Sequence, residues 1–146
     1  MKVLVLNGPN LNLLGIREPE IYGTESLADL ERELVIIAQP RGVELVFVQS
    51  NHEGVLIDWL QQAFFENYDG VIFNPGAYTH YSYAIHDAVA SITTPVIEVH
   101  LSDITQREAF RQHSVLETVA MARFYGKHFQ SYHEALYYLI AEENTK

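Results

Sequence analysis

Arg17 and Tyr22 have the residue types and the spacing of a base and the cation that activates it. A tyrosine phenol has a pKa of about 10, so it removes a proton near neutral pH only when that pKa is lowered. A neighbouring guanidinium lowers it by favouring the phenolate. The segment 7–22 is also long for a strand-to-helix connection, and long ordered loops often close over a binding site. We predict that residues 7–22 form a catalytic loop; spacing alone fits an ordinary surface loop equally well.

A carboxylate and an imidazole, Glu98 and His100, stand two positions apart at the end of an apolar run. Alternate residues of a strand face the same side, so we expect the two groups to meet. The carboxylate would fix the tautomer of the imidazole and support its protonated form, as a general acid requires. The alternative is a histidine with satisfied hydrogen bonds at a strand end. Arg107 and Arg111 follow four residues apart, one helical turn, and either one reaches the site or both belong to a solvated helix face.

Residues 74–80 lie between a predicted strand and a predicted helix. Gly76 permits tight backbone geometry there, and the start of the helix offers free N–H groups to an anion. The side chains of Asn74 and His80 could form hydrogen bonds with hydroxyl groups. A plain turn with a helix cap is the alternative for this segment.

Short apolar runs and helical patterns alternate along the chain. Four runs rich in β-branched residues are predicted strands: 2–6, 44–48, 70–73 and 96–99. A fifth strand is predicted at 119–125, although Arg123 interrupts its apolar pattern. Helices are predicted at 26–38, where Ser26 and Asp29 suggest a capping box, and at 56–64, 82–90 and 132–141.

This alternation predicts one α/β domain over residues 1–146, with parallel strands, right-handed crossovers and helices on both faces. Five strands suit a flavodoxin-like order, 2-1-3-4-5. Ligands of such sheets bind beyond the carboxyl ends of the strands, near the switch point. We therefore expect the loop at 7–22, the segment 74–80 and the segment after residue 99 to meet there.

The composition excludes several functions. The 146 residues include 19 acidic and 9 basic ones, a net charge of −10 without a basic run, which argues against nucleic-acid and membrane partners. The chain has no cysteine, so disulfides, thiolate nucleophiles and cysteine zinc sites are excluded, which suits a cytoplasmic location. The N-terminal apolar run is too short for a signal peptide or a membrane span. The seven histidines lack ligand spacing such as H-E-x-x-H, so no metal is expected.

Three motifs, taken together, resemble the type II 3-dehydroquinate dehydratases, also called type II dehydroquinases. They are Asn-Gly-Pro-Asn-Leu-Asn-Leu-Leu-Gly from residue 7 with Arg-Glu-Pro and Tyr-Gly, Asn-Pro-Gly-Ala-Tyr-Thr-His from residue 74, and Ile-Glu-Val-His-Leu-Ser from residue 97 with Arg-Glu-x-Phe-Arg-x-His-Ser from residue 107. The resemblance covers essentially the whole chain. It implies a flavodoxin-like lyase that removes water from 3-dehydroquinate by anti elimination through an enolate, giving 3-dehydroshikimate without metal or other cofactor.

The same resemblance implies a role for each matching residue. Tyr22 is the base that removes the C2 proton, and Arg17 lowers its pKa. Asn10 holds a water near the developing enolate. His100 protonates the departing C1 hydroxyl, and Glu98 orients it.

Substrate binding and assembly are implied in the same way. Asn74, His80 and Arg111 hold the ring hydroxyls, and the backbone N–H groups of Leu101 and Ser102 hold the substrate carboxylate. Asp87 reaches the site of a neighbouring subunit, because the family assembles as trimers grouped into dodecamers. The step serves either the shikimate pathway of aromatic amino acid biosynthesis or quinate catabolism.

The sequence departs from the family pattern at Tyr81, His86 and Asp103, and over residues 115–133, which include Arg123. These departures concern the subunit interface and the wall of the site, and so oligomer size and affinity. Another small lyase or hydrolase would not need a tyrosine and an arginine in one loop. The complete set of candidate residues argues against a descendant without activity. A flavodoxin-like FMN-binding module would need a Ser/Thr/Gly-rich phosphate loop after the first strand, where this chain is rich in Asn and Leu. A flavin absorbance spectrum would distinguish that module.

Overall fold

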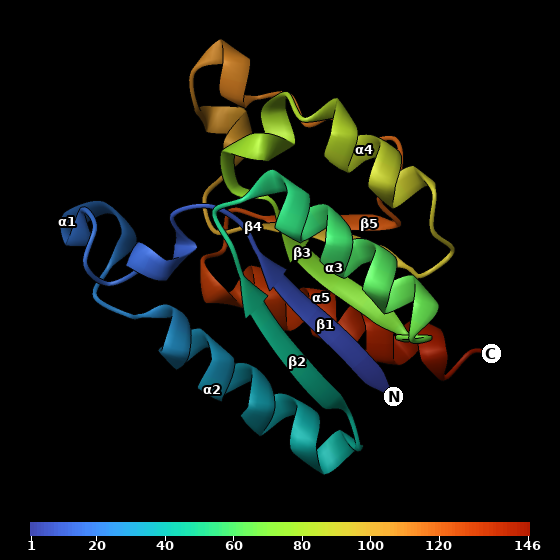
Figure 1. Cartoon of the computed structure of the whole chain (residues 1–146). Coiled ribbons are helices and arrows are strands. Elements are labelled where there is room, and N and C mark those ends of the chain that lie inside the picture. Colours follow the sequence, from blue (N-terminus) through green and yellow to red (C-terminus); the bar gives the residue numbers. More distant parts are fainter.

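Five parallel strands form the centre of the protein in the order β2-β1-β3-β4-β5 (Figure 1). The computed structural model describes residues 1–146, apart from the side chain of Tyr22. The strands are β1 (Lys2–Asn7), β2 (Glu44–Gln49), β3 (Gly70–Asn74), β4 (Val96–His100) and β5 (Ala122–Tyr125). The predicted fold class and strand order are confirmed. The first four strands each end one residue later than predicted, which makes Asn7, Asn74 and His100 the last residues of their strands.

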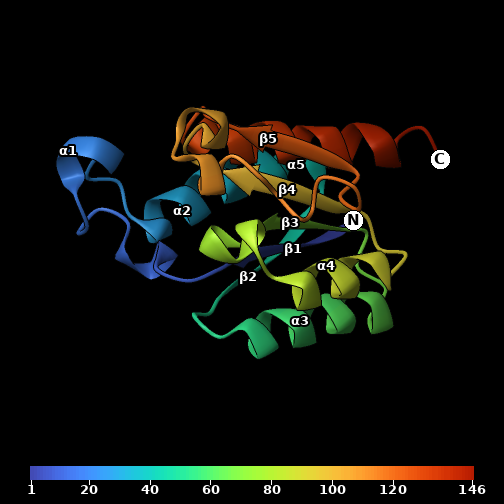
Figure 2. The ribbon, with the colours of Figure 1, turned by 90° about the horizontal axis from the view of Figure 1, so that it is seen from above.

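Helices cover both faces of the sheet, as predicted (Figure 2). Helices α2 (Leu27–Ala38) and α5 (Phe129–Glu143) pack on one face, and α3 (Glu53–Phe65) and α4 (Tyr83–Ala90) on the other. Alternation along β1 supplies both cores, because Val3 and Val5 join the first and Leu4 and Leu6 the second. A strand buried on both faces is mostly apolar, which explains why the central strands stand out as apolar runs in the sequence.

Two helix starts are fixed by serine caps. Ser26 accepts a hydrogen bond from the backbone N–H of Asp29, whose side chain accepts one in return, so the predicted capping box is present. Ser82 accepts from the backbone N–H of Ile85 and caps α4. By contrast, α3 and α5 each begin three residues before their predicted starts, because apolar periodicity marks the buried face of a helix and not its first turn.

The connection after β1 contains the short helices η1 (Leu11–Leu13) and α1 (Pro19–Tyr22), and α1 projects from the body of the fold (Figure 1). At its start the chain passes so close to the end of β3 that a Cβ on Gly8 would lie 2.6 Å from the carbonyl oxygen of Pro75. The backbone N–H of Gly8 donates to the carbonyl of Asn74 at 2.8 Å. Glycine at this position therefore lets the loop begin beside the residue that ends β3.

Strand β5 begins at Ala122, later than the predicted residue 119. The N–H groups of Val119 and Ala120 donate to the carbonyl of Leu116, so the chain still turns there. Arg123 nevertheless lies within the strand, paired in register with Glu98 of β4. Within the part of the chain that the structure describes, no helix is long and apolar enough to cross a membrane.

Candidate active site

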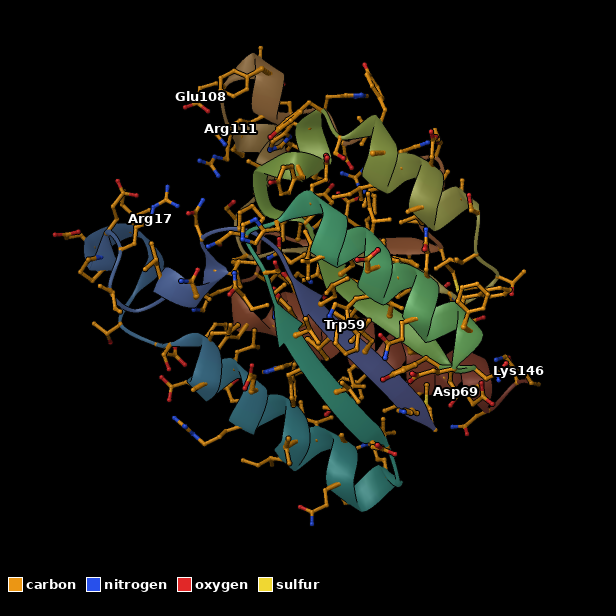
Figure 3. The ribbon with its side chains drawn as sticks, in the orientation of Figure 1. Arg17, Trp59, Asp69, Glu108, Arg111 and Lys146 are labelled. Atoms are coloured by element: carbon orange, nitrogen blue, oxygen red, sulfur yellow. The ribbon has the colours of Figure 1, made fainter. Side chains whose placement is uncertain are left out.

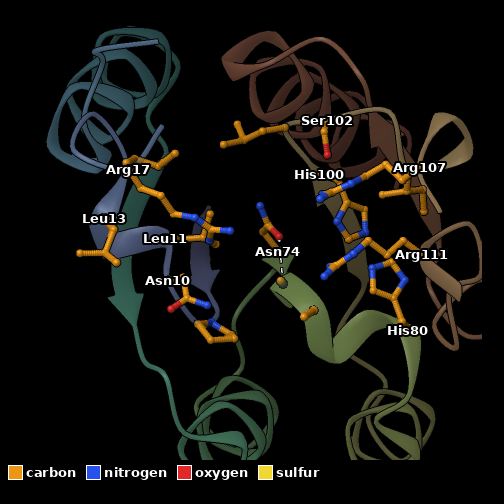
Figure 4. A pocket seen from close by; sticks show the side chains of 16 residues that line it. Asn10, Leu11, Leu13, Arg17, Asn74, His80, His100, Ser102, Arg107 and Arg111 are labelled. Carbon is orange, nitrogen blue, oxygen red and sulfur yellow. Dashed lines mark hydrogen bonds between the residues drawn. The ribbon is translucent and has the colours of Figure 1, made fainter. Parts of the chain in front are cut away.

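A pocket of about 200 Å³ opens at the carboxyl ends of β1, β3 and β4 (Figure 4). Asn10, Leu11 and Arg17 lie on one side of it, His80, His100 and Arg111 on the other, and Asn74 between them. Asp69 and Lys146 lie at the opposite end of the sheet (Figure 3). Most of the predicted site residues line the pocket: Asn10, Arg17, Asn74, His80, His100, Leu101, Ser102 and Arg111. The expectation that three segments meet at this edge is confirmed.

His100 lines the pocket with Glu98 behind it, and the predicted contact is present. The imidazole Nε2 lies 2.7 Å from Glu98 Oε1. Two hydroxyls, Thr79 Oγ1 at 2.5 Å and Ser114 Oγ at 2.6 Å, donate to the same oxygen. Sequence reasoning missed both hydroxyls, although each adjoins a histidine of the quoted motifs, His80 or His113.

The carboxyl group of Glu98 is completely buried. Burial by itself raises its pKa, but the hydrogen bond and charge of His100 and the hydrogen bonds from Ser114 and Thr79 outweigh that effect and lower the pKa to about 2. Glu98 is therefore an anion at neutral pH. An anion on Nε2 fixes the orientation of the imidazole.

The surroundings of His80 favour the neutral form of its imidazole. Burial, with the nearby charges of His100, Arg111 and Arg107, lowers its pKa against the opposing effect of a hydrogen bond to the carbonyl of His113. That carbonyl lies 2.8 Å from Nδ1, which must therefore carry the proton. Nε2 is left as an acceptor that can take a hydrogen bond from a ligand hydroxyl.

Asn74 is oriented by a buried chain of hydrogen bonds. Its amide Nδ2 donates to the hydroxyl of Tyr132 at 2.9 Å, and that hydroxyl donates to Asn7 Oδ1 at 2.6 Å. Its Oδ1 accepts from the backbone N–H of Gly76 at 3.1 Å. Both asparagines end strands, and Tyr132 comes from α5 far along the chain, so local sequence patterns gave no sign of this contact.

Asn10 adopts a left-handed backbone conformation, with φ of 70°. Its backbone N–H donates to Asn51 Oδ1 at 3.1 Å, and the carbonyl of Asn51 accepts from the hydroxyl of Tyr78 at 3.0 Å. Asparagine tolerates this conformation better than most residues. These bonds hold the backbone at Asn10 while its side chain lines the pocket.

Three guanidinium groups, of Arg17, Arg107 and Arg111, line the pocket. The prediction that Arg107 and Arg111 share one helical turn is wrong. The chain forms two short 3₁₀ helices, η4 (Ile104–Gln106) and η5 (Ala109–Arg111), and Arg107 between them is extended, with φ of −99° and ψ of −176°. Both side chains still reach the pocket, so three cations suit an anionic ligand there. Arg107 was noted for its spacing but was not among the predicted binding residues.

The sequence model of the family described as dehydroquinase class II matches residues 1–140. The chain belongs to that family. It is similar to the 3-dehydroquinate dehydratase of Bacillus pumilus, at 55% identity over 95% of this chain and 94% of the relative, and to that of Caldicellulosiruptor bescii, at 54% over 94% and 95%. The crystal structure of the type II dehydroquinase from Butyrivibrio crossotus superposes with a TM-score of 0.92 at 48% identity, covering 95% of this chain and 97% of that one.

Among the predicted site residues with described side chains, Glu98 and Asp87 do not line the pocket. The side chain of Asp87 is 78% exposed, and its Oδ1 lies 2.9 Å from Nδ1 of His86. The side chain of Tyr22 lies outside the described residues, although its backbone ends α1. Among the residues described, no group of three or more His, Cys, Asp or Glu side chains could hold a metal ion.

Proposed function

We propose that the chain catalyses the dehydration of 3-dehydroquinate to 3-dehydroshikimate by anti elimination through an enolate, as a hydro-lyase. The observation that carries this proposal is the buried Glu98 carboxylate at 2.7 Å from Nε2 of His100, and His100 lines a pocket together with three arginines. An oriented imidazole supplies a proton, and the arginines suit a substrate that is a carboxylate. The family assignment does not favour an FMN-binding module.

The first step is removal of a proton next to a ketone. Such a proton is weakly acidic, so the reaction needs a base and support for the negative charge that develops on the enolate oxygen. We assign Tyr22 as the base and Arg17, from the same loop, as the cation that keeps it a phenolate. Asn10 holds a water that donates to the enolate oxygen.

The second step is departure of the C1 hydroxyl, which needs a proton to leave as water. His100 supplies it. Because Glu98 occupies Nε2, Nδ1 is the nitrogen left to face the substrate. The buried anion stabilises the imidazolium before transfer and holds the ring in place afterwards.

The remaining pocket groups hold the substrate. Nε2 of His80 accepts a hydrogen bond from a ring hydroxyl, and Asn74 and Arg111 contact the other hydroxyls. The backbone N–H groups of Leu101 and Ser102 receive the carboxylate, next to the guanidinium of Arg107. All these residues line the pocket, which supports the assignment.

We further propose that the protein acts in the cytoplasm as a dodecamer built from trimers, in which Asp87 extends into the site of a neighbouring subunit. The exposure of Asp87 leaves it available for such a contact. The step serves either aromatic amino acid biosynthesis through shikimate or quinate catabolism. The neighbouring genes would distinguish these two roles, and sedimentation of the purified protein would test the assembly.

The test of the activity is turnover of 3-dehydroquinate by purified protein pretreated with a chelator. We expect the enone absorbance of the product to appear without added metal. Borohydride treatment in the presence of substrate should leave the activity intact, because no lysine forms a Schiff base in this scheme. Well-folded protein that leaves 3-dehydroquinate unchanged would refute the proposed function.

A further inference from the structure

Arg123 contacts the Glu98 carboxylate and does not line the pocket. Its strand β5 lies beside β4, and the register pairs Arg123 with Glu98. The guanidinium Nε lies 3.0 Å from Glu98 Oε2, and the Arg123 side chain is only 19% exposed. This is the arginine that interrupted the apolar pattern of the predicted fifth strand.

The two oxygens of Glu98 have different surroundings. Oε1 accepts hydrogen bonds from the hydroxyls of Thr79 and Ser114 and lies beside Nε2 of His100. Oε2 is buried and has no hydrogen-bond donor among the described residues, so its close neighbour is the positive charge of Arg123. An ion contact shielded from water is much stronger than one at the surface. Removing one partner of such a pair leaves an uncompensated buried charge.

We propose that Arg123 is a positioning residue that keeps Glu98 anionic whether or not His100 carries its proton, and that it thereby sets the pH at which the Glu98–His100 pair releases that proton. This inference rests on the proposed function, in which His100 must lose and regain a proton in each cycle. Without Arg123, the loss of the imidazole proton would leave a buried carboxylate with no cation in contact. The pair would then hold its proton more tightly, and His100 would be a weaker acid.

Arg123 is a charged partner of Glu98 in addition to His100. Glu98 has two ion-pair partners, His100 and Arg123, among the described residues. Arg123 is itself held by Glu117, whose Oε1 lies 3.4 Å from its Nη1, and by the ring of Tyr125 at 5.4 Å. The other titratable or charged side chains that line the pocket with His100 are Arg17, His80, Arg107 and Arg111.

The experiment compares the parent with Arg123→Gln, which removes the charge, and Arg123→Lys, which keeps it. Arg32→Gln is the control, because it removes the same charge from an exposed arginine of α2 that pairs with Asp29. For each protein, kcat and KM for 3-dehydroquinate are measured against pH. The His100 imidazole signal, assigned by its absence in His100→Asn, is followed by NMR over the same range. Thermal unfolding reports whether each variant is folded.

We expect Arg123→Gln to move the alkaline limb of the kcat profile up by about one pH unit and to lower kcat several-fold, with KM changed by less than about twofold. The His100 signal should titrate at a correspondingly higher pH. Arg123→Lys should restore most of both shifts, and Arg32→Gln should match the parent. A purely structural role would lower the melting temperature without moving the limb or the NMR titration.

The NMR titration keeps this inference separate from the proposed function. If the parent fails to turn over 3-dehydroquinate, the proposed function is wrong, and the titration still decides the role of Arg123. If His100 titrates at the same pH in the parent and in folded Arg123→Gln, the inference is overturned even where turnover is normal. Should Arg123→Gln fail to fold, the same comparison is made between the parent and Arg123→Met, which also removes the charge, and identical His100 titrations in these two folded proteins overturn the inference.

Discussion

His100 Nε2 lies 2.7 Å from Oε1 of Glu98, and the carboxylate is completely buried behind the imidazole. Replacing Glu98 by Gln keeps the shape of the side chain but removes the charge that supports the imidazolium. The alkaline limb of the kcat profile should therefore move to lower pH, with kcat reduced about 10- to 100-fold. This direction is opposite to that expected for Arg123→Gln.

The matched control for this prediction is Glu33→Gln. Glu33 is also an imidazole partner, 2.9 Å from His133, but neither residue lines the pocket. Its pH profile should equal that of the parent. A Glu98→Gln profile with an unmoved alkaline limb would show that the carboxylate does not tune the acid.

Tyr22→Phe tests the base. The substitution removes only the phenol oxygen, so we expect kcat to fall by about 10²- to 10⁴-fold, the usual contribution of a general base. The circular dichroism spectrum and melting temperature should stay those of the parent. Tyr137→Phe, at a half-exposed tyrosine of α5, is the control and should retain full activity. Near-normal turnover by Tyr22→Phe would remove Tyr22 from the mechanism.

Arg17→Ala tests the cation that activates the base. Loss of the guanidinium should move the acidic limb of the kcat/KM profile, which reports ionisation of the base in the free enzyme, by about one unit toward higher pH. Arg41→Ala removes an exposed cation beyond the end of α2 and should leave that limb in place. An acidic limb at the parent position in Arg17→Ala would exclude this role of Arg17.

The lowered pKa of Glu98 predicts that the folded protein loses stability in acid. Its folded pKa of about 2 lies below its ordinary value of 4.5, so the stabilisation is fully present above pH 4.5 and is lost as the pH falls toward 2. The expected loss is roughly 3 kcal/mol of unfolding free energy. Urea unfolding at several pH values measures it. Glu98→Gln should lack this component of the acid destabilisation, and equal pH slopes for parent and variant would contradict the prediction.

The sheet and the edge that carries the pocket were predictable because their signals are local. Buried strands are continuous apolar runs, and in a parallel sheet their carboxyl ends meet at one edge, which brings Asn74 and His100 together. The capping box of Ser26 and Asp29 marked the start of α2. The boundaries of α3 and α5 were less accurate, because their first turns carry few apolar residues.

The contacts that were missed join residues distant in sequence. Tyr132 and Asn74 meet only because α5 packs across the sheet, and Arg123 meets Glu98 only through strand register. Side-chain type gives no sign of such contacts, and Arg123 even weakened the prediction of the strand that carries it. The helical spacing of Arg107 and Arg111 was misleading, because the chain there bends into two separate 3₁₀ turns.

The stereochemistry of elimination tests the central claim most directly. The substrate is 3-dehydroquinate with deuterium at one C2 position, anti to the C1 hydroxyl, and the product is analysed by NMR or mass spectrometry. A base in the loop after β1 and an acid at the end of β4 act from opposite sides of the pocket, so the anti deuterium should be lost and the product should contain none. Product that retains the deuterium would mean syn elimination and would contradict the assignment of Tyr22 and His100 as base and acid.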